Sequence, residues 1–257
     1  MGDADRFDRR RPVLRSDRRD SQDGADRPGY RLRRRGRRAG VRLVRGGAGR
    51  GVTGFEFFAA HPAHVRDFQA AMSERTAAFA PGVAAGYDFS AARTVADVGG
   101  GTGTLLAAVL QAHGHLKGVL FYRLEVAAEA AGVLAAAGVT SRCEVVAGDF
   151  FAGVPEGADI YLLANVLHDW DDARSVQILA SCRQAMAAGG RVLIVERLIP
   201  ADPADAVPVL LSDLNMLVLT GGMERTTAEY AALMSRAGLT PGRVLGVAEP
   251  YAIVECM

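Results

Sequence analysis

The sequence predicts an α/β fold in which a seven-stranded, mostly parallel sheet carries helices on both faces. Two observations support this prediction: a glycine-rich turn follows a short apolar strand, and strand-like and helix-like segments alternate regularly after it. Alternation at this spacing is typical of parallel strands joined by helical crossovers. In such a Rossmann-like sheet, ligands bind along the edge formed by the carboxyl ends of the strands.

The glycine-rich turn lies between a strand expected at 94–98 and a helix expected near 103–113. Its three spaced glycines allow positive φ and close approach of a ligand to the backbone: Gly99, Gly101 and Gly103. Thr104 stands where a dinucleotide motif needs a further glycine or alanine. Asp97 would attract a cationic amino group and repel a pyrophosphate. Both points favour S-adenosylmethionine over NAD as the ligand; a purely structural glycine turn is the alternative.

The remaining elements follow from the alternation of apolar and polar residues. Further strands are expected at 117–121, 142–147, 158–164 and 190–196, and helices near 125–137, 171–187, 206–219 and 226–237. Two closing segments near 242–247 and 250–256 form a reversed pair, which completes the seven strands. Before the glycine turn, aromatic residues at helical spacing predict two amphipathic lead-in helices separated near His61 and Pro62.

Charge divides the chain into unequal parts. Residues 1–52 contain 17 Arg and 7 Asp, whereas acidic residues outnumber basic ones in the rest, so the net charge of +1 conceals a strong asymmetry. The arginine-rich segment lacks periodic apolar residues and is expected to be disordered. Three interpretations are open: a basic arm that binds nucleic acid, a solvated tail without a role, or sequence translated from a shifted reading frame. We therefore expect three regions: 1–52, a helical lead-in at 53–92, and the main domain at 93–257.

Composition also limits the cellular setting. Three scattered cysteines, Cys143, Cys182 and Cys256, fit neither a disulfide framework nor a metal cluster, so we expect a reducing cytoplasm and no bound metal. No apolar stretch is long enough to cross a membrane, and no signal-peptide pattern follows the arginine-rich start. The acidic folded part would repel a nucleic-acid backbone, which makes a nucleic-acid partner the least favoured reading.

A histidine follows the fourth expected strand at the ligand-binding edge. His168 lies in Leu163-Ala-Asn-Val-Leu-His-Asp-Trp-Asp-Asp172, and imidazole can accept a proton from a hydroxyl near neutral pH. Such a base needs a carboxylate to orient its ring, and Glu196 and Glu224 are the two candidates. The alternatives are a structural histidine and, for Glu224, a polar residue that simply suits a glycine turn. The neighbouring aspartates resemble charges at a helix start rather than metal ligands.

The third expected strand leads into Gly148-Asp-Phe-Phe151. Asp149 and Phe150 could bracket an adenine, with the carboxylate near its amino group and the ring against its face. A simple turn is the equally weighted alternative.

Taken as an ordered set, these motifs resemble class I S-adenosylmethionine-dependent O-methyltransferases of the caffeate/acetylserotonin type, particularly bacterial members that tailor aromatic secondary metabolites. The resemblance runs from about residue 54 to the end and also includes Val195-Glu-Arg197 and Asp213 to Leu217. It implies His168 as the base, flanked by Glu196 and Glu224, with Asp149 and Phe150 at the adenosyl group. It further implies a small aromatic acceptor, bound near three residues: Trp170, Asn215 and Met216.

Two departures from this family stand out. Its members carry an N-terminal winged-helix domain that forms the homodimer, and residues 1–52 occupy that place here. The second expected strand should end in an acid that holds the ribose, but this chain has Tyr122, with Glu125 as a substitute or a helix cap. The alternatives to an active methyltransferase are therefore a truncated, catalytically silent relative and a member that uses the cofactor without methylating.

Overall fold

A computed structural model describes residues 61–122, 127–202 and 206–257, all within one compact unit that spans residues 39–257. The arginine-rich segment, the first expected lead-in helix and Glu125 lie outside the described residues. The structure therefore bears on the second lead-in helix and on the domain that follows it.

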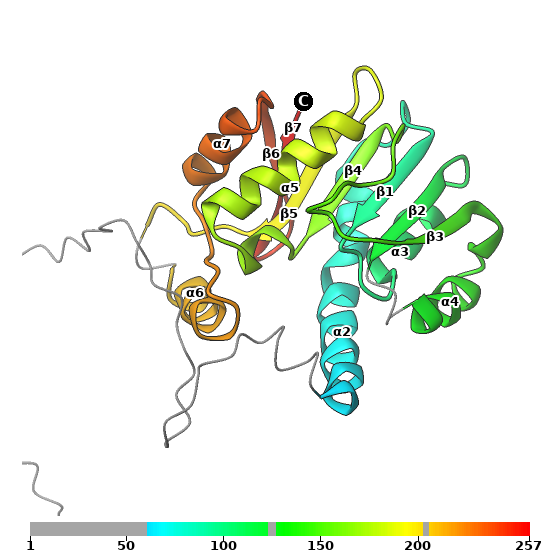
Figure 1. The fold of residues 1–257 in the computed structure, drawn as a ribbon, viewed down its shortest axis with the longest axis horizontal. Helices are drawn as coiled ribbons and strands as arrows, with labels where there is room; N and C mark the ends of the chain where they lie inside the picture. Colours follow the sequence, from blue (N-terminus) through cyan, green and yellow to red (C-terminus); the bar gives the residue numbers. More distant parts are fainter. Residues whose placement is uncertain (1–60, 123–126, 203–205) are drawn as a thin grey trace, which may run out of the picture. The chain divides into compact units, whose positions relative to one another are not determined.

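The predicted seven-stranded sheet is present, with the order β3-β2-β1-β4-β5-β7-β6 (Figure 1). The first five strands run parallel, and β7 pairs antiparallel with both β5 and β6, which confirms the reversed pair at the end. The strands are β1 (Thr94–Val98), β2 (Lys117–Tyr122), β3 (Cys143–Ala147), β4 (Ile160–Ala164), β5 (Arg191–Arg197), β6 (Pro241–Ala248) and β7 (Tyr251–Cys256).

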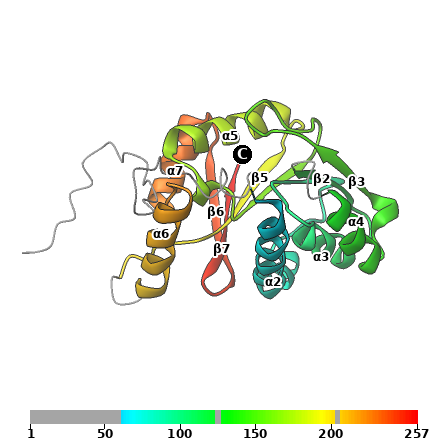
Figure 2. The ribbon, with the colours of Figure 1, turned by 60° about the horizontal axis from the view of Figure 1, so that its bottom comes forward.

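Helices cover both faces of the sheet, as Figures 1 and 2 show. One buried apolar cluster joins one face to α2, α3 and α4, and a second joins the other face to α5 and α7. The helices are α2 (Pro62–Gly86), α3 (Thr104–Ala112), α4 (Ala127–Ala136), α5 (Asp172–Ala185), α6 (Val207–Leu219) and α7 (Thr227–Arg236), with short 3₁₀ turns η2 (Thr140–Arg142) and η3 (Leu167–Asp169). These bounds agree closely with the expected ranges.

The lead-in helix α2 belongs to the core of the domain. The break expected near His61 and Pro62 coincides with the start of this 25-residue helix. A Cβ on Gly82 would lie 2.3 Å from the carbonyl oxygen of Val247, so α2 approaches β6 at backbone distance. The ring of Phe79 stacks on Tyr251 with 4.2 Å between centroids. Burial of such large aromatic side chains ties α2 to the sheet.

Helix starts are defined by local hydrogen bonds. Asp171 caps α5, where its side chain accepts from the backbone N–H of Arg174, as expected for an acidic cluster at a helix start. Thr226 and Glu229 form a reciprocal capping box at α7.

None of the described helices combines the length and apolar character needed to cross a membrane. All three cysteines are free thiols.

Strand register brings the functional segments to one edge. Val98 pairs with Phe121 and Tyr122 with Ala147, while Ala164 pairs with Val195. The functional segments consequently all lie at the carboxyl ends of parallel strands, where ligands bind in open α/β sheets. These segments are the glycine turn, Tyr122, the turn after β3, η3 and Glu196.

Candidate active site

His168 lies in the 3₁₀ turn η3, just after β4, and only 5% of its surface is exposed. The chain leaves β4 through Asn165, whose φ of 52° is in the left-handed region. Asparagine tolerates this conformation better than most residues. The turn therefore places the imidazole inside the edge of the sheet, among the side chains that follow β5 and α6.

The carboxylate of Glu196 contacts both the backbone of this turn and the ring of His168. Its Oε1 accepts hydrogen bonds from the consecutive backbone N–H groups of Val166 (3.1 Å), Leu167 (3.0 Å) and His168 (3.3 Å). Its Oε2 lies 3.3 Å from Nδ1 of His168. Each oxygen of this buried carboxylate thus has polar neighbours, and these neighbours compensate for the cost of burying a charge at the end of a strand.

Glu224 approaches the same ring nitrogen from the other side. Its Oε1 lies 3.4 Å from Nδ1 of His168 and accepts a hydrogen bond of 2.7 Å from the hydroxyl of Ser212. Its backbone N–H donates to Oδ1 of Asp213 at 2.9 Å. Arg197 in turn donates to the Ser212 hydroxyl at 3.2 Å. Helix α6 therefore positions the second carboxylate.

The loop that carries Glu224 lies against the backbone of η3. The N–H of Met223 donates to the carbonyl oxygen of His168 at 2.8 Å. A Cβ on Gly222 would lie 1.9 Å from that same oxygen and 2.6 Å from the carbonyl carbon of Asp169. Only glycine fits here, because a contact that short with backbone atoms cannot be relieved without moving the loop.

Arg225 joins the two segments from the interior. Its guanidinium is 1% exposed and donates to the carbonyl oxygens of Leu167 (2.9 Å) and Trp170 (2.8 Å), on either side of His168. It also pairs with Asp172 at 2.9 Å. The planar guanidinium donates in several directions at once, so one side chain fixes η3, the start of α5 and the Glu224 loop together.

Charge in this cluster favours a proton on the imidazole. Burial lowers the pKa of His168, but Glu196, Asp169 and Glu224 outweigh burial and raise that pKa to about 10. Burial raises the pKa of Glu196 to about 7 and that of Asp169 to about 6, against the opposing effect of His168. Burial also acts on Glu224, but its contacts with His168 and Ser212 hold its pKa below the usual value.

The same three side chains form the one group of potential metal-binding donors among the described residues. Their donor atoms lie within 4.8 Å of one another. Nδ1 of His168 lies 3.3 Å from Glu196 and 3.4 Å from Glu224, so a protonated ring would offset one of the two carboxylate charges. The group is therefore self-contained as an ion-pair triad, and our expectation of no bound metal stays a prediction.

The glycine turn has the backbone conformation that the sequence predicts. Gly99, Gly101 and Gly103 all have positive φ, of 76°, 56° and 81°. Beneath the turn, Asp97 is fully buried, and neither carboxylate oxygen has a hydrogen-bond partner among the described residues. Burial raises its pKa to about 7, and the backbone N–H of Leu106 offsets only part of that effect. A buried acid in this state favours a cationic partner.

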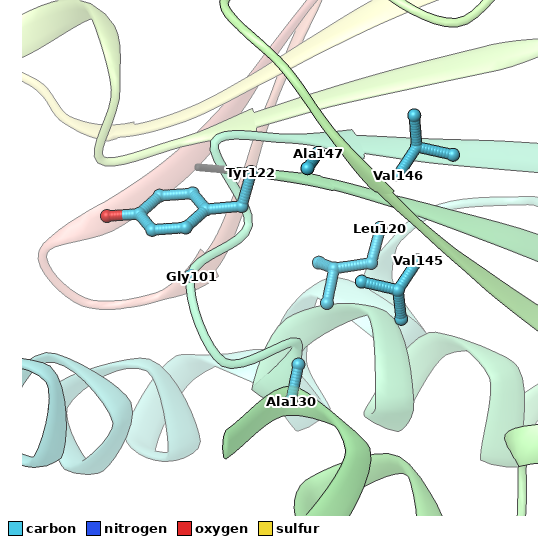
Figure 3. Close-up of a pocket in the computed structure, with 7 residues that line it drawn as sticks. All are labelled: Gly101, Leu120, Tyr122, Ala130, Val145, Val146 and Ala147. Carbon is cyan, nitrogen blue, oxygen red and sulfur yellow. The ribbon is translucent and has the colours of Figure 1, made fainter. Parts of the chain in front are cut away.

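Tyr122 ends β2 beside a small hollow, shown in Figure 3. The hollow is lined by Gly101, Leu120, Tyr122, Ala130, Val145, Val146 and Ala147. Apart from the tyrosine hydroxyl, these side chains are apolar. Tyr122 accepts a hydrogen bond of 3.1 Å from Nε2 of Gln69, on helix α2.

Aromatic side chains gather on the other side of the glycine turn. Phe150 lies 5.9 Å from Trp170 and 4.8 Å from Phe151, between ring centroids. A Cβ on Gly99 would lie 3.9 Å from the Phe150 ring, so this ring borders the turn. Asp149 is exposed, and its side chain accepts from the backbone N–H of Phe151 at 2.9 Å, which is a local turn contact.

The two residues expected near the acceptor lie on α6. Met216 is 6% exposed and Asn215 is exposed, and both follow Ser212 by about one helical turn. Among the described residues, no hydrogen bond or ion pair joins either side chain to His168, so their role stays a prediction.

Sequence reasoning missed several residues that build the site: Gln69, Arg197, Ser212 and Arg225. Gln69 and Tyr122 are 53 positions apart, and Arg225 and Leu167 are 58 apart. One signal was available for Arg225, since a full positive charge next to the Glu224 turn needs a partner when it is buried.

Comparison with known proteins identifies the family of the chain. A sequence model described as an O-methyltransferase domain matches residues 45–240, more than half of the chain. The chain is 44% identical over 205 residues to phenazine O-methyltransferase PhzM of Lysobacter antibioticus, covering 80% of this chain and 60% of that protein. It is 47% identical over 189 residues to the mitomycin biosynthesis 6-O-methyltransferase of Streptomyces lavendulae, covering 73% of this chain and 54% of that protein.

A solved structure gives the same result. The crystal structure of NcsB1, an O-methyltransferase from neocarzinostatin biosynthesis in complex with S-adenosylmethionine and 2-hydroxy-5-methyl naphthoic acid, superposes with a TM-score of 0.74 at 37% identity. That match covers 80% of this chain and 61% of the NcsB1 chain. The chain thus spans less than two thirds of the length of the relatives that it matches. It belongs to the O-methyltransferase domain family.

Proposed function

We propose that this chain transfers a methyl group from S-adenosylmethionine to a phenolic or enolic hydroxyl of a small aromatic, polyketide-like metabolite. The observation that carries this proposal is the position of His168, whose Nδ1 lies between Glu196 and Glu224 at 3.3 and 3.4 Å. A base oriented by buried carboxylates, at the ligand-binding edge of this fold, suits removal of a hydroxyl proton. Of the relatives described above, one is a phenazine O-methyltransferase, one an O-methyltransferase of mitomycin biosynthesis, and one was solved with 2-hydroxy-5-methyl naphthoic acid.

The described residues fit the proposed cofactor. Asp97 presents a buried carboxylate that has no hydrogen-bond partner in the part of the chain that the structure describes, which suits an α-amino group. Gly99 and Gly101 leave room for close approach to the turn, and Phe150 borders it with an aromatic ring. The sulfonium of S-adenosylmethionine supplies an already activated methyl group, so the chain mainly has to align the acceptor and move one proton.

Proton removal falls to His168. Nδ1 faces the two glutamates, and Nε2, which lies 3.8 Å from Oδ1 of Asp169, is the nitrogen that would accept the proton of the acceptor hydroxyl. With a pKa of about 10 the ring holds both protons near neutral pH, so the base is its neutral form, whose share grows as pH rises toward 10. Transfer from a phenol, whose pKa is also about 10, to that neutral form is nearly balanced in free energy. A positioned base of this kind accelerates reaction by typically about 10²–10⁴-fold.

Glu196 and Glu224 are the positioning residues for this base. Each stabilises the imidazolium that forms when His168 takes the proton, and Glu196 also fixes the backbone on which the ring stands. We infer that α6, through Asn215 and Met216, together with Trp170, forms one wall of the acceptor site. Ser212 and Asp213 link this helix to Glu224, so acceptor binding and ring orientation share one element.

The setting follows from the same reasoning. The free thiols of the described chain suit a reducing cytoplasm. The resemblance implies a homodimer, although residues 1–52 occupy the place of the domain that forms it in other members. Tyr122 favours one alternative function, a relative that keeps the triad but binds the cofactor weakly, because a neutral phenol replaces the expected acid.

The proposal is tested by calorimetric titration of S-adenosylhomocysteine and by incubation with S-adenosylmethionine and a panel of hydroxynaphthoic acids. We expect saturable binding, loss of binding in Asp97→Asn, and a product heavier by one methyl group on oxygen. Aminonaphthoic acids of matched shape serve as the control for hydroxyl acceptors. Weak binding, or binding without methyl transfer to any hydroxyl, would support the alternative, and absence of binding would reject the proposed activity.

A further inference from the structure

Gln69 of α2 lies over the glycine turn and reaches the end of β2. Its side chain is 6% exposed, and its Nε2 donates to the hydroxyl of Tyr122 at 3.1 Å. A Cβ on Gly101 would lie 3.5 Å from Oε1 of Gln69, so the carboxamide oxygen faces the turn. A buried carboxamide and a phenol are thus joined where the turn and the second strand meet.

Helix α2 is fastened to the turn at a second point. The hydroxyl of Ser73, four residues after Gln69, lies 2.6 Å from that of Thr102, which is 3.1 Å from that of Thr104. Residues four apart share one face of a helix. The position of Gln69 above Gly101 is therefore set by the packing of α2 as well as by its own hydrogen bond.

The hollow beside this pair divides into an apolar part and a polar rim. Figure 3 shows Tyr122 extending from β2 on the Gly101 side, away from Val145 and Val146. The apolar part is lined by side chains of β2, β3 and α4, and the tyrosine hydroxyl lies at the polar rim. Vicinal hydroxyls need both donors and acceptors, and a phenol with a carboxamide provides both.

We propose that Gln69 and Tyr122 together bind the ribose hydroxyls of the cofactor, as a neutral pair in place of the carboxylate expected at the end of β2. This inference rests on the proposed cofactor, and it goes further by assigning recognition of the sugar to a residue of the lead-in helix. It accounts for the burial of Gln69, for its contact with Tyr122, and for the departure at position 122.

The test compares two ligands by calorimetry: S-adenosylhomocysteine and its 2′,3′-dideoxy analogue, which lacks both ribose hydroxyls. We expect Tyr122→Phe and Gln69→Leu each to weaken binding of S-adenosylhomocysteine by about three- to tenfold and to leave binding of the analogue unchanged. The double variant should lose less than the product of the two single losses, since the two residues act as one unit.

Tyr161→Phe is the matched control. Its hydroxyl donates to the carbonyl oxygen of Pro155 at 2.6 Å, away from the hollow, so its loss should leave the preference between the two ligands unchanged. Equal weakening of both ligands by Tyr122→Phe, or no weakening of either, would overturn the inference.

Two further outcomes separate this inference from the proposed function. Binding by Tyr122→Asp but not by the unaltered chain would mean that Tyr122 obstructs the site; the inference would fail and the proposed cofactor would stand. Absence of binding by both chains would reject the cofactor, and this inference with it.

Discussion

Glu196 binds His168 twice, through the backbone N–H at 3.3 Å and through Nδ1 of the ring at 3.3 Å, with a different oxygen for each. Glu196→Gln keeps an acceptor for the backbone amides but removes the negative charge beside the ring. We expect the pKa of His168 to fall in this variant while the fold is retained. Titration of the His168 ring followed by NMR measures the change, and an unaltered pKa would contradict the electrostatic role of Glu196.

Glu196→Ala separates the two functions of this carboxylate. It removes the acceptor of three buried backbone N–H groups, and each unsatisfied group costs about 1–3 kcal/mol. We therefore expect a substantially lower unfolding free energy for Glu196→Ala than for Glu196→Gln in denaturant melts. Equal stabilities would show that the backbone contacts contribute little.

Gly222→Ala should disrupt the site without unfolding the domain. Its Cβ would lie 1.9 Å from the carbonyl oxygen of His168, so the loop must shift and carry Glu224 away from the ring. We expect methyl transfer to fall by at least about tenfold, because misplaced catalytic groups lose that much and more. Gly246→Ala is the control, since nothing lies within 4 Å of a Cβ at that position. Equal activity of both variants would refute the argument.

Arg225→Met tests whether the buried guanidinium sets the geometry of the triad. The change leaves the carbonyl oxygens of Leu167 and Trp170 without this donor, which should lower the unfolding free energy by roughly 2–4 kcal/mol. We also expect the pKa of His168 to fall, because Glu224 moves away from the ring.

Arg142→Met provides the comparison for Arg225→Met. Arg142 also donates to backbone carbonyl oxygens, but to those of Leu110 in α3 and Leu116 just before β2. It should lose stability without altering the titration of His168. A similar pKa change in both variants would mean that Arg225 acts only through general stability.

The raised pKa of His168 makes stability depend on pH. The ordinary value is 6.5 and the folded value is about 10, so the protonated ring stabilises the fold fully below pH 6.5, and this stabilisation is lost as pH rises toward 10. The pKa values of Glu196 and Asp169, about 7 and about 6, lie below that of His168. The stability difference between the unaltered chain and His168→Gln should therefore narrow between pH 7 and pH 10 in denaturant melts. A constant difference would contradict the assignment.

The fold could be predicted because its signals are local. Glycines at 99, 101 and 103 each need positive φ, and the strands after them are apolar runs separated by helical periods. The triad could be proposed for the same reason, since His168 and Glu196 both follow strands whose ends must meet at one edge of a parallel sheet.

What could not be predicted depends on the angle between elements. Gln69 falls within the expected second lead-in helix, and nothing in its neighbours in the sequence indicates that α2 crosses above Gly101. Ser212 and Arg225 likewise gain their roles only when α6 and the loop before α7 fold against η3. Contacts of this kind join distant positions through side-chain packing, which periodicity does not encode.

The most direct test of the central claim is the rate of methyl transfer from labelled S-adenosylmethionine to a hydroxynaphthoic acid by the unaltered chain and by His168→Gln, at saturating cofactor. The account predicts a rate lower by about 10²–10⁴-fold in the variant, with binding of S-adenosylhomocysteine unchanged. Equal rates in the two chains would contradict His168 as the base, and no transfer by the unaltered chain despite bound cofactor would contradict the proposed methyltransferase activity.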